Sequence, residues 1–520
     1  MLDTPGVYIR EIPSGSRPIS GVATSNTAFV GTFSRGPVNT ATRVTSYGEF
    51  ERMFGGLAAN SETSYGVRAY FLNGGSVAFI VRVATAAAAA AAGSIDDLDL
   101  TATSPGVWGN NLRIGIAHGA DAATFTMLVR EYDGDTVVRE EVFIDVTATA
   151  GPRFVDDVVA EESELIEANQ TSGNRPSATQ VDGADATTLD ELLETAAADF
   201  VALAGGNDGV METDAGWAAV ASATIRGSEA ASSGIYALNQ IVPQVFNLMC
   251  LPGAAVFDTD NAASAAIYQE AYAFCRTNYA FLIVDPPGNV DRANMAGWLT
   301  ALGSAAGPNS SLYYPRLTGP DPLNPLQPRE IGPSGVAAGL FARTDANRGV
   351  WKAAAGTEAR VVGGTPVDVM TDRQQGPVNT AGVNVIRTFP VYNTIIWGAR
   401  TLDGADARAS EWRYNSVRRL ALFIENSLQR GLQWVVFEPN DEPLWASVRL
   451  NVGAFMNQLH RQGAFQGASA RDAYLVKCDS ETTTQADINL GILNVYVGFA
   501  PVRPAEFVII RIQQRFQTAA

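Results

Sequence analysis

The chain has 520 residues, of which 46% are hydrophobic and 17% charged, a mixture typical of a folded globular protein rather than a disordered or fibrous one. Its 54 acidic residues outnumber 36 basic ones, and the net charge of −18 argues against a nucleic-acid groove or an anionic membrane surface as partner. The start, MLDTPGVYIREI, lacks the basic end and apolar run of a secretory signal, and no stretch approaches the ~18 apolar residues of a membrane span. We therefore expect a soluble protein that is made in the cytoplasm.

The acidic excess lies in one segment. Residues 93–209 contain 23 Asp or Glu and five Arg, whereas the rest of the chain has 31 acidic and 31 basic residues. Such a block is stable only where water solvates it, so we predict an outward-facing acidic insertion in an otherwise neutral body. The basic residues are 34 Arg and two Lys, which fits bidentate pairing at interfaces and equally a GC-rich gene. Three scattered cysteines are too few for a disulfide framework and indicate buried thiols.

The N-terminal third begins with an extended segment and then becomes regular. Residues 1–22 are rich in Pro, Gly and Ser, and GVYIREI has no local strand partner, which indicates an extended arm. From residue 27 a strand–helix–helix–strand rhythm follows: a buried strand 27–31, a helix from Ser46 with Glu49 at capping-box spacing, a helix 62–72 and a strand 77–83. The alanine run 86–92 then indicates a linker rather than a helix.

The acidic segment and the region after it show different patterns. Within 93–209, NLRIGIA, TFTMLVREY and VVREEVFIDV predict antiparallel strands, followed by a helix over 154–170. Strands and helices then alternate from 245 to 315, and the Pro- and Gly-rich stretch 315–335 predicts a long surface loop. The remaining predictions are strand 383–389, helix 412–430, strand 433–438, helix 443–462 and the closing strands 473–478, 492–499 and 506–516.

These patterns predict an α/β (mixed α+β) core built from two separated chain segments, with a β-rich acidic insertion domain and extended terminal arms. The expected boundaries are an N-terminal arm 1–22, a first core part 23–92, the insertion 93–209, a second core part 210–500 and a C-terminal strand arm 501–520. The last strand lies at the terminus, so it could pair outside its own subunit.

The sequence contains none of the enzyme motifs considered below, and we expect no catalytic, cofactor or metal site. Lys352 is followed by Ala and Lys477 by Cys, so the chain has no P-loop, and no G-x-G or G-x-S-x-G occurs. His118 and His460 lack metal-ligand spacing. Asp285 ends the apolar run FLIV and could bind magnesium in a nucleotide enzyme, but without a phosphate loop a helix-capping role is the better interpretation.

Several motifs, in order, resemble the contractile tail sheath proteins of bacteriophages. The opening PGVYIREI…RPISGVATSNTAFVGTFSRGPVN…VTSYGEFERMFGG carries the resemblance, as do SPGVWGNNLRI, LAGGNDG and NLMCLPG. It continues in PSGVAAGLFARTDANRGVWKAAAG, GVNVIR, WGARTL and the long run from Tyr414 to QGAFQG. The resemblance spans nearly the whole chain, and it is weakest in 93–209.

The resemblance implies a non-enzymatic subunit that polymerises, as a helix or stacked rings, around a tail tube and contracts to drive the tube through the host envelope. Its implied partners are further copies of itself, the tail tube protein, and baseplate and tail terminator or neck proteins, without nucleic acid or membrane insertion. The implied location is the virion tail, after synthesis in the host bacterial cytoplasm. In such proteins both chain ends add strands to neighbouring subunits, which here implies the arm residues Val7, Tyr8, Ile9, Arg10, Glu11, Ile12, Phe507, Val508, Ile509, Ile510, Arg511 and Ile512.

Two further points stay open at this stage. The predicted helix 412–430 carries Arg413, Arg418 and Arg419, which could meet an acidic tube, although a solvated helix face is an equally good interpretation. The sheath of a tailocin or of an extracellular contractile injection system is an alternative with the same mechanics. A remote alternative is an α/β nucleotide-dependent enzyme that uses Asp285.

Overall fold

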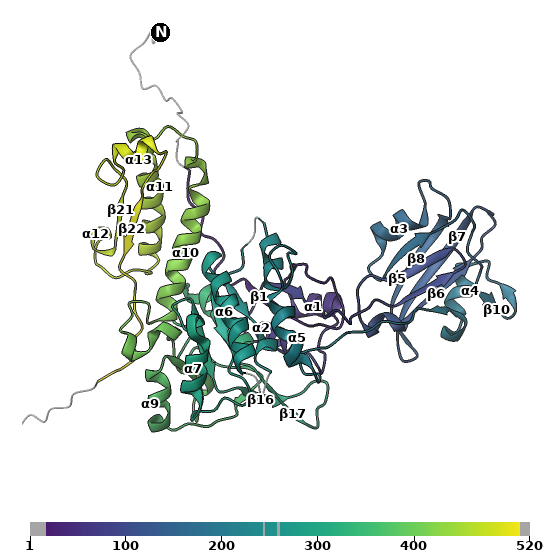
Figure 1. The fold of residues 1–520 in the computed structure, drawn as a ribbon, viewed down its shortest axis with the longest axis horizontal. Coiled ribbons are helices and arrows are strands. Elements are labelled where there is room, and N and C mark those ends of the chain that lie inside the picture. Colours follow the sequence, from purple (N-terminus) through teal and green to yellow (C-terminus); the bar gives the residue numbers. More distant parts are fainter. Residues whose placement is uncertain (1–16, 243–244, 257–260, 510–520) are drawn as a thin grey trace, which may run out of the picture.

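The computed structural model describes residues 17–242, 245–256 and 261–509, which fold into a mixed α+β protein (Figure 1). Its centre is an eight-stranded sheet in which two antiparallel edge strands flank a parallel interior. In sheet order, the strands are β2 (Thr42–Val44), β3 (Ala78–Arg82), β1 (Thr27–Gly31), β13 (Leu248–Cys250), β14 (Phe281–Val284), β15 (Ser310–Tyr314), β19 (Val383–Phe389) and β20 (Asn393–Ile396). The sheet therefore combines strands from both sides of the acidic segment.

Helices cover both faces of this sheet. Successive strand residues point to opposite faces, so both faces are apolar and each needs a covering layer. In β1, Ala28 and Val30 join one apolar cluster and Phe29 joins the other. The first face is covered by α5 (Trp217–Arg226), α6 (Asn261–Thr277) and α7 (Met295–Leu302), and the second by α1 (Tyr47–Phe54), α2 (Glu62–Leu72) and α8 (Ser334–Arg348). The predicted Ser46 cap of α1 is confirmed: its hydroxyl accepts from the Glu49 N–H at 3.1 Å.

The segment between β3 and α5 forms sheets of its own around a separate apolar cluster. One sheet runs β12 (Val201–Ala202), β6 (Leu112–Ala117), β7 (Thr124–Asp133), β8 (Thr136–Thr147), and another β4 (Ala92–Ile95), β5 (Leu98–Ala102), β9 (Ile166–Gln170). The entering and leaving chains pair with each other, since Ala89 and Asn207 exchange backbone hydrogen bonds of 2.9 Å each. Figure 1 shows this unit projecting from the central sheet on that double connection.

A C-terminal subdomain, residues 415–499, stands on the other side of the central sheet (Figure 1). It consists of α10 (Asn415–Gly431), α11 (Glu442–Arg461), α12 (Ala470–Ala473), α13 (Gln485–Asn489) and the antiparallel pair β21 (Tyr474–Lys477) and β22 (Tyr496–Phe499). The helix predicted over 443–462 is confirmed as α11, and one of its faces is buried, with Leu444, Val448, Val452, Phe455, Met456 and Leu459. Among the described residues, no helix is both long and apolar enough to cross a bilayer.

Three sequence predictions of secondary structure are wrong. The helix expected over 154–170 is split into α3 (Val155–Glu162) and β9, because the Ser163 hydroxyl accepts the N–H groups of Leu165 and Ile166, and β9 pairs with β5. The loop expected at 315–335 contains the strands β16 (Leu317–Pro320) and β17 (Pro328–Ile331), which pair with each other.

The third wrong prediction is the strand at 433–438. Gln433–Val435 is a 3-10 turn instead, and Phe437 has a φ of +70°, in the left-handed region rather than the β region. Trp434 and Val435 pack against the core between α10 and α11, so this apolar run closes the turn between two helices. In the terminal strand expected at 506–516, residues 506–509 have no strand structure and the remainder lies outside the described residues.

Candidate functional site

The carboxyl edge of the parallel strands is where α/β proteins usually bind ligands, and here buried protein groups occupy it. Asp285 follows β14 directly and is fully buried. Its carboxylate accepts from the Ser334 N–H at 2.7 Å and from the Ser334 hydroxyl, so it caps the start of α8. Burial raises the pKa of Asp285 to about 6, against the opposing effects of Ser334 and Arg316.

Two further buried carboxylates tie the neighbouring loops together. Glu62 accepts from Arg316 Nη2 at 2.7 Å and from the Gly332 N–H at 2.8 Å. Glu212 accepts three hydrogen bonds, from the Thr32 N–H at 2.9 Å and from the N–H and hydroxyl of Thr63 at 2.7 Å each. Burial nevertheless raises the pKa of Glu212 to about 7. These groups join α2 and the segment before α5 to the loops that follow β1 and β15.

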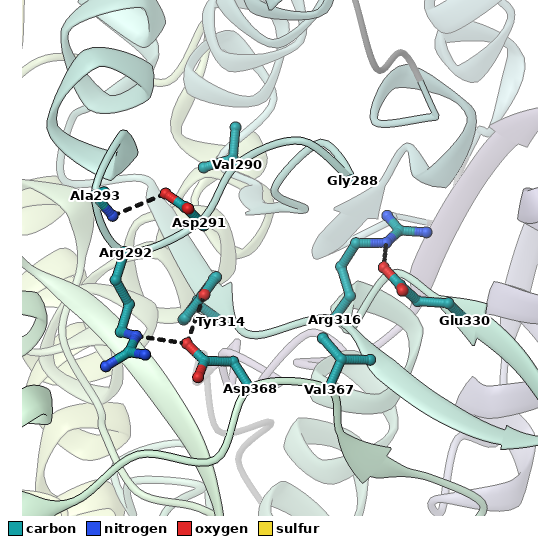
Figure 2. A pocket seen from close by; sticks show the side chains of 10 residues that line it. All are labelled: Gly288, Val290, Asp291, Arg292, Ala293, Tyr314, Arg316, Glu330, Val367 and Asp368. Carbon is teal, nitrogen blue, oxygen red and sulfur yellow. Dashed lines mark hydrogen bonds and ion pairs between the residues drawn. The ribbon is translucent and has the colours of Figure 1, made fainter.

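A hollow of about 540 Å³ lies beside these loops (Figure 2). Arg292 Nε lies 2.7 Å from Asp368 Oδ2, which also accepts from the Tyr314 hydroxyl at 2.8 Å. Arg316 Nε donates to Glu330 at 2.8 Å. Both arginines that line the hollow are therefore paired with acids, which leaves it poorly suited to a phosphate.

The described residues contain no group of three or more His, Cys, Asp or Glu that could hold a metal ion. His118 Nε2 lies 2.7 Å from the Pro176 carbonyl oxygen, and His460 Nε2 lies 3.2 Å from that of Gly467. The cysteines Cys250, Cys275 and Cys478 are buried and free. Each histidine thus has a backbone carbonyl as its partner.

The N-terminal arm residues Val7, Tyr8, Ile9, Arg10, Glu11 and Ile12 lie outside the described residues. Residues 17–22, which precede the first strand, pack on the C-terminal subdomain of the same chain. The Arg17 guanidinium lies 4.8 Å from the centroid of the Trp434 ring, and Ile19 is buried between α10 and α11. Ile19 approaches so closely that a Cβ on Gly431 would lie 2.6 Å from it.

The C-terminal arm leaves at the other end of this subdomain. Phe507, Val508 and Ile509 are 71%, 81% and 80% exposed and belong to no strand of the described chain. Ile510, Arg511 and Ile512 lie outside the described residues. Three consecutive apolar side chains are thus exposed on the described part of the chain.

The three arginines proposed to meet a tube have different surroundings. Arg419 is buried against Asp345, with Nη2–Oδ2 at 2.6 Å, and its guanidinium also covers the Phe341 ring. Arg418 bonds Asn309 Oδ1 at 2.8 Å and Glu425 at 3.1 Å. Arg413, with a 32% exposed side chain, pairs with Asp406. Arg419 therefore serves the interior of the subunit, and Arg413 has the most accessible side chain of the three.

Sequence reasoning missed a cluster around Glu506, in which Arg400, Asn379 and Tyr414 surround its carboxylate. Arg400 is 106 residues away from Glu506 in the chain, and no local spacing signals such a contact. The buried pair of Arg316 with Glu62 was missed for the same reason.

The chain matches two adjacent family models. Residues 215–402 match the phage tail sheath protein central domain, and residues 408–515 match the phage tail sheath C-terminal domain. A putative prophage major tail sheath protein of Pseudomonas aeruginosa (strain UCBPP-PA14) is 27% identical over 183 residues, or 34% of this chain and 44% of that protein. The tail sheath protein of Burkholderia phage BcepMu is 32% identical over 163 residues, or 30% of this chain and 32% of that protein. The matches thus span less than half of either relative.

Solved structures with the same fold cover almost the entire chain. The sheath of the extracellular contractile injection system PVC, in its contracted state, has a TM-score of 0.57 and 23% identity, with 99% of this chain and 98% of that chain covered. The sheath tail protein of Listeria innocua has a TM-score of 0.61 and 13% identity, with 93% and 96% covered. At these identities the likeness shows the fold. Because the two sheath models together match more than half of the sequence, this chain belongs to the phage tail sheath protein family.

Proposed function

We propose that this chain is the structural subunit of a contractile sheath, which polymerises around a tail tube and contracts to drive the tube through a host cell envelope. Two sheath family models match it over most of residues 215–515. The observation that carries the proposal beyond family membership is the exposed apolar run at 507–509, at the end of a folded body that offers it no strand partner among the described residues.

Strand addition is the mode of self-association that this chain end fits best. An extended peptide that joins an exposed sheet edge gains directional backbone hydrogen bonds, each worth about 1 kcal/mol net. An arm with five such bonds would hold a neighbour by several kcal/mol while leaving the folded bodies free to rotate. The short pair β21 and β22 supplies a sheet edge of the required kind, and residues 7–12 would act likewise at the other end.

The remaining partners follow from the same proposal. Related folds occur in structures named as a PVC sheath complex and as anti-feeding prophage baseplates, which supports a homopolymer that ends on a baseplate. A tail tube protein inside and a terminator or neck protein at the far end complete the assembly, and its place would be the virion tail. A tailocin or an extracellular injection system would use the same mechanics, and micrographs of native particles with or without a capsid separate these cases.

The five-part division of the chain is also a proposal, with the acidic segment 93–209 facing outward. The separate apolar cluster of this segment and its double connection to the body support that placement. For the tube-facing surface we keep Arg413 as the candidate contact. The burial of Arg419 against Asp345 and the internal bonds of Arg418 give these two a role inside the subunit.

Electron microscopy of the purified full-length chain tests the proposal. We expect hollow tubes or stacked rings from the complete chain, and none from a variant that ends at Glu506, since that truncation removes the exposed apolar run but no residue of the central sheet. A circular dichroism melt checks that the truncated body still folds. A monomeric complete chain over a wide range of concentrations, or a truncated chain that polymerises equally well, would contradict the proposed function.

A further inference from the structure

The last described segment, residues 500–509, crosses from the C-terminal subdomain back to the core. It leaves β22, and the Val502 N–H donates to the Ala464 carbonyl at 3.3 Å. Residues 502–508 then border a hollow of about 890 Å³ whose other walls include Trp351, Trp397 and Gly463. The segment is therefore incompletely packed along its length, and beyond Val502 one of its side chains makes several polar contacts with the core.

That side chain is Glu506. Its Oε1 accepts from Arg400 Nε at 2.7 Å and from Asn379 Nδ2 at 2.9 Å, and its Oε2 accepts from the Tyr414 hydroxyl at 3.1 Å. Arg413 Nη2 lies 3.7 Å from the same Oε2. The donors come from α9 (Asp372–Thr380), from the segment after β20 and from the residue that precedes α10. Three parts of the fold thus hold one carboxylate.

Arg400 is itself fixed by the core. Its side chain is 1% exposed, and Nη1 donates to the Asn379 carbonyl at 2.9 Å and lies 3.0 Å from Asp406 Oδ1. Its backbone N–H donates to Asn384 Oδ1 at 2.6 Å, and Asn384 lies on β19 in the central sheet. A buried guanidinium held in this way requires carboxylate partners. Arg400 therefore has partners other than Glu506, which hold its backbone and its Nη1.

The charge state of Glu506 agrees with this geometry. Burial alone would raise its pKa, but the hydrogen bonds from Arg400 and Asn379 outweigh burial and hold the pKa below the usual range of a glutamate. The group is thus ionised at neutral pH, where the interaction with Arg400 is charge-assisted.

We propose that Glu506 is the positioning residue that fixes where, and in which direction, the C-terminal arm leaves the subunit toward a second copy of this chain. The inference rests on the proposed function, in which the arm at 507–509 adds to a neighbour. A pull on the arm then passes through Arg400 and Asn384 into the eight-stranded sheet. Without Glu506 it would act on the hydrogen bond from Val502 to Ala464 and on β22, a strand of four residues in a two-stranded sheet.

The first test is made on the full-length chain at concentrations where it is monomeric. Spin labels on V508C and on R373C, an exposed position on α9, report the distance from the arm to the core, while the native cysteines are buried. We expect a narrow distance distribution in the wild-type background and one about twofold broader with E506A. The charge-neutral E506Q retains an acceptor for Arg400 and should give an intermediate width.

The matched control is D406N, which removes another carboxylate from Arg400 and from Arg413 and alters no side chain of residues 500–509. It should retain the narrow distribution, and thermal melts should give similar midpoints for D406N and E506Q. Should E506A fold poorly, the comparison of E506Q with D406N still decides the outcome. Identical distributions for wild type, E506Q and E506A would overturn the inference, whether or not the chain polymerises.

The second test concerns assembly. An arm that is fixed in advance loses less conformational entropy when it binds, so we expect the critical concentration for polymerisation of E506A to be about tenfold higher than that of wild type. If E506A has the same critical concentration as wild type although its spin-label distance distribution is broader, the proposed link between Glu506 and assembly is overturned. If wild type itself fails to polymerise, the proposed function fails, and the monomer distances still report on the anchor.

Discussion

At the residue scale, ion pairs of similar composition have very different surroundings. Arg419 and Asp345 are 4% and 3% exposed and join α10 to α8. Arg348, the last residue of the same α8, and its partner Glu358 are 51% and 59% exposed. Burial makes the loss of one partner costly, because the other charge remains unpaired in a low dielectric, whereas water screens the exposed pair.

We therefore expect R419A to lower the free energy of unfolding by about 3–5 kcal/mol, since it leaves Asp345 buried without its cation. R348A should lower it by less than about 1 kcal/mol. Urea unfolding of both variants, followed by circular dichroism, measures the difference. Equal losses would show that burial of the Arg419 pair contributes nothing. R419E would place a second acid beside the buried Asp345, so loss of tube binding in that variant would not show that Arg419 contacts a tube.

Glu212 gives the protein a pH dependence with a defined sign. Burial raises its folded-state pKa to about 7, from an ordinary value of 4.5, so the folded chain binds this proton more tightly than the unfolded chain. The stability that protonation supplies is fully present below about pH 4.5 and is lost as pH rises through about 7. One pKa unit corresponds to about 1.4 kcal/mol.

We expect E212Q to remove this contribution. The amide also faces three donors, so the variant should be less stable than wild type at pH 5. The difference in free energy of unfolding between the two proteins should be smaller by about 1–3 kcal/mol at pH 8. Urea titrations at both pH values provide the measurement. E358Q, which removes an exposed carboxylate, serves as the control, and its free energy of unfolding is measured at the same two pH values. A gap for E212Q that is independent of pH would contradict the assignment of the titration to this residue.

At the element scale, the sequence predicts best those elements whose own residues determine them. Strand β1 is a continuous apolar run, and α11 repeats its apolar residues at helical spacing, so local pattern alone identifies both. The parallel alternation on either side of the acidic segment likewise predicts a core that is shared between two chain segments.

The failures have a common physical cause, which is pairing with distant residues. The periodicity of 154–170 fits one helix, but residues 166–170 pair with β5 as the strand β9. The helix ends before Ser163, whose hydroxyl accepts from the Leu165 N–H. Residues 317–331 contain Gly and Pro at loop frequency, yet β16 pairs with β17 and also with β18 (Thr365–Pro366). The Glu506 site belongs to the same class, since its donors lie 92 to 127 residues away. Tertiary contacts of this kind leave no local signature.

At the scale of the whole molecule, charge is separated from the assembling body. The segment 93–209 carries a net charge of −18 and the remaining chain is neutral. Its two connections meet, because Ala92 and Ala204 exchange backbone hydrogen bonds of 2.8 and 3.0 Å. In an antiparallel pair such residues lie about 5.5 Å apart, a distance that a two-residue Asn-Gly turn closes. Replacing residues 93–203 by such a turn leaves every strand of the central sheet in the chain, but it removes the Pro105 carbonyl that accepts from Arg82 of β3 at 2.7 Å and the Glu131 carboxylate that pairs with Arg35.

In the proposed assembly around a tube, the acidic segments of neighbouring copies would lie near one another, and salt should weaken the resulting repulsion. Between about 0.01 and 0.15 M ionic strength the Debye length falls from about 30 to 8 Å, so we expect the critical concentration of wild-type assembly to fall over this range. Light scattering of the variant that lacks residues 93–203 should show little salt dependence. A second variant retains the segment but carries D133N, D135N and E194Q, at exposed positions. The salt dependence of its critical concentration should lie between that of wild type and that of the shortened chain. If the shortened chain responds to salt as strongly as wild type does, the repulsion arises in the body, and the acidic segment has another role.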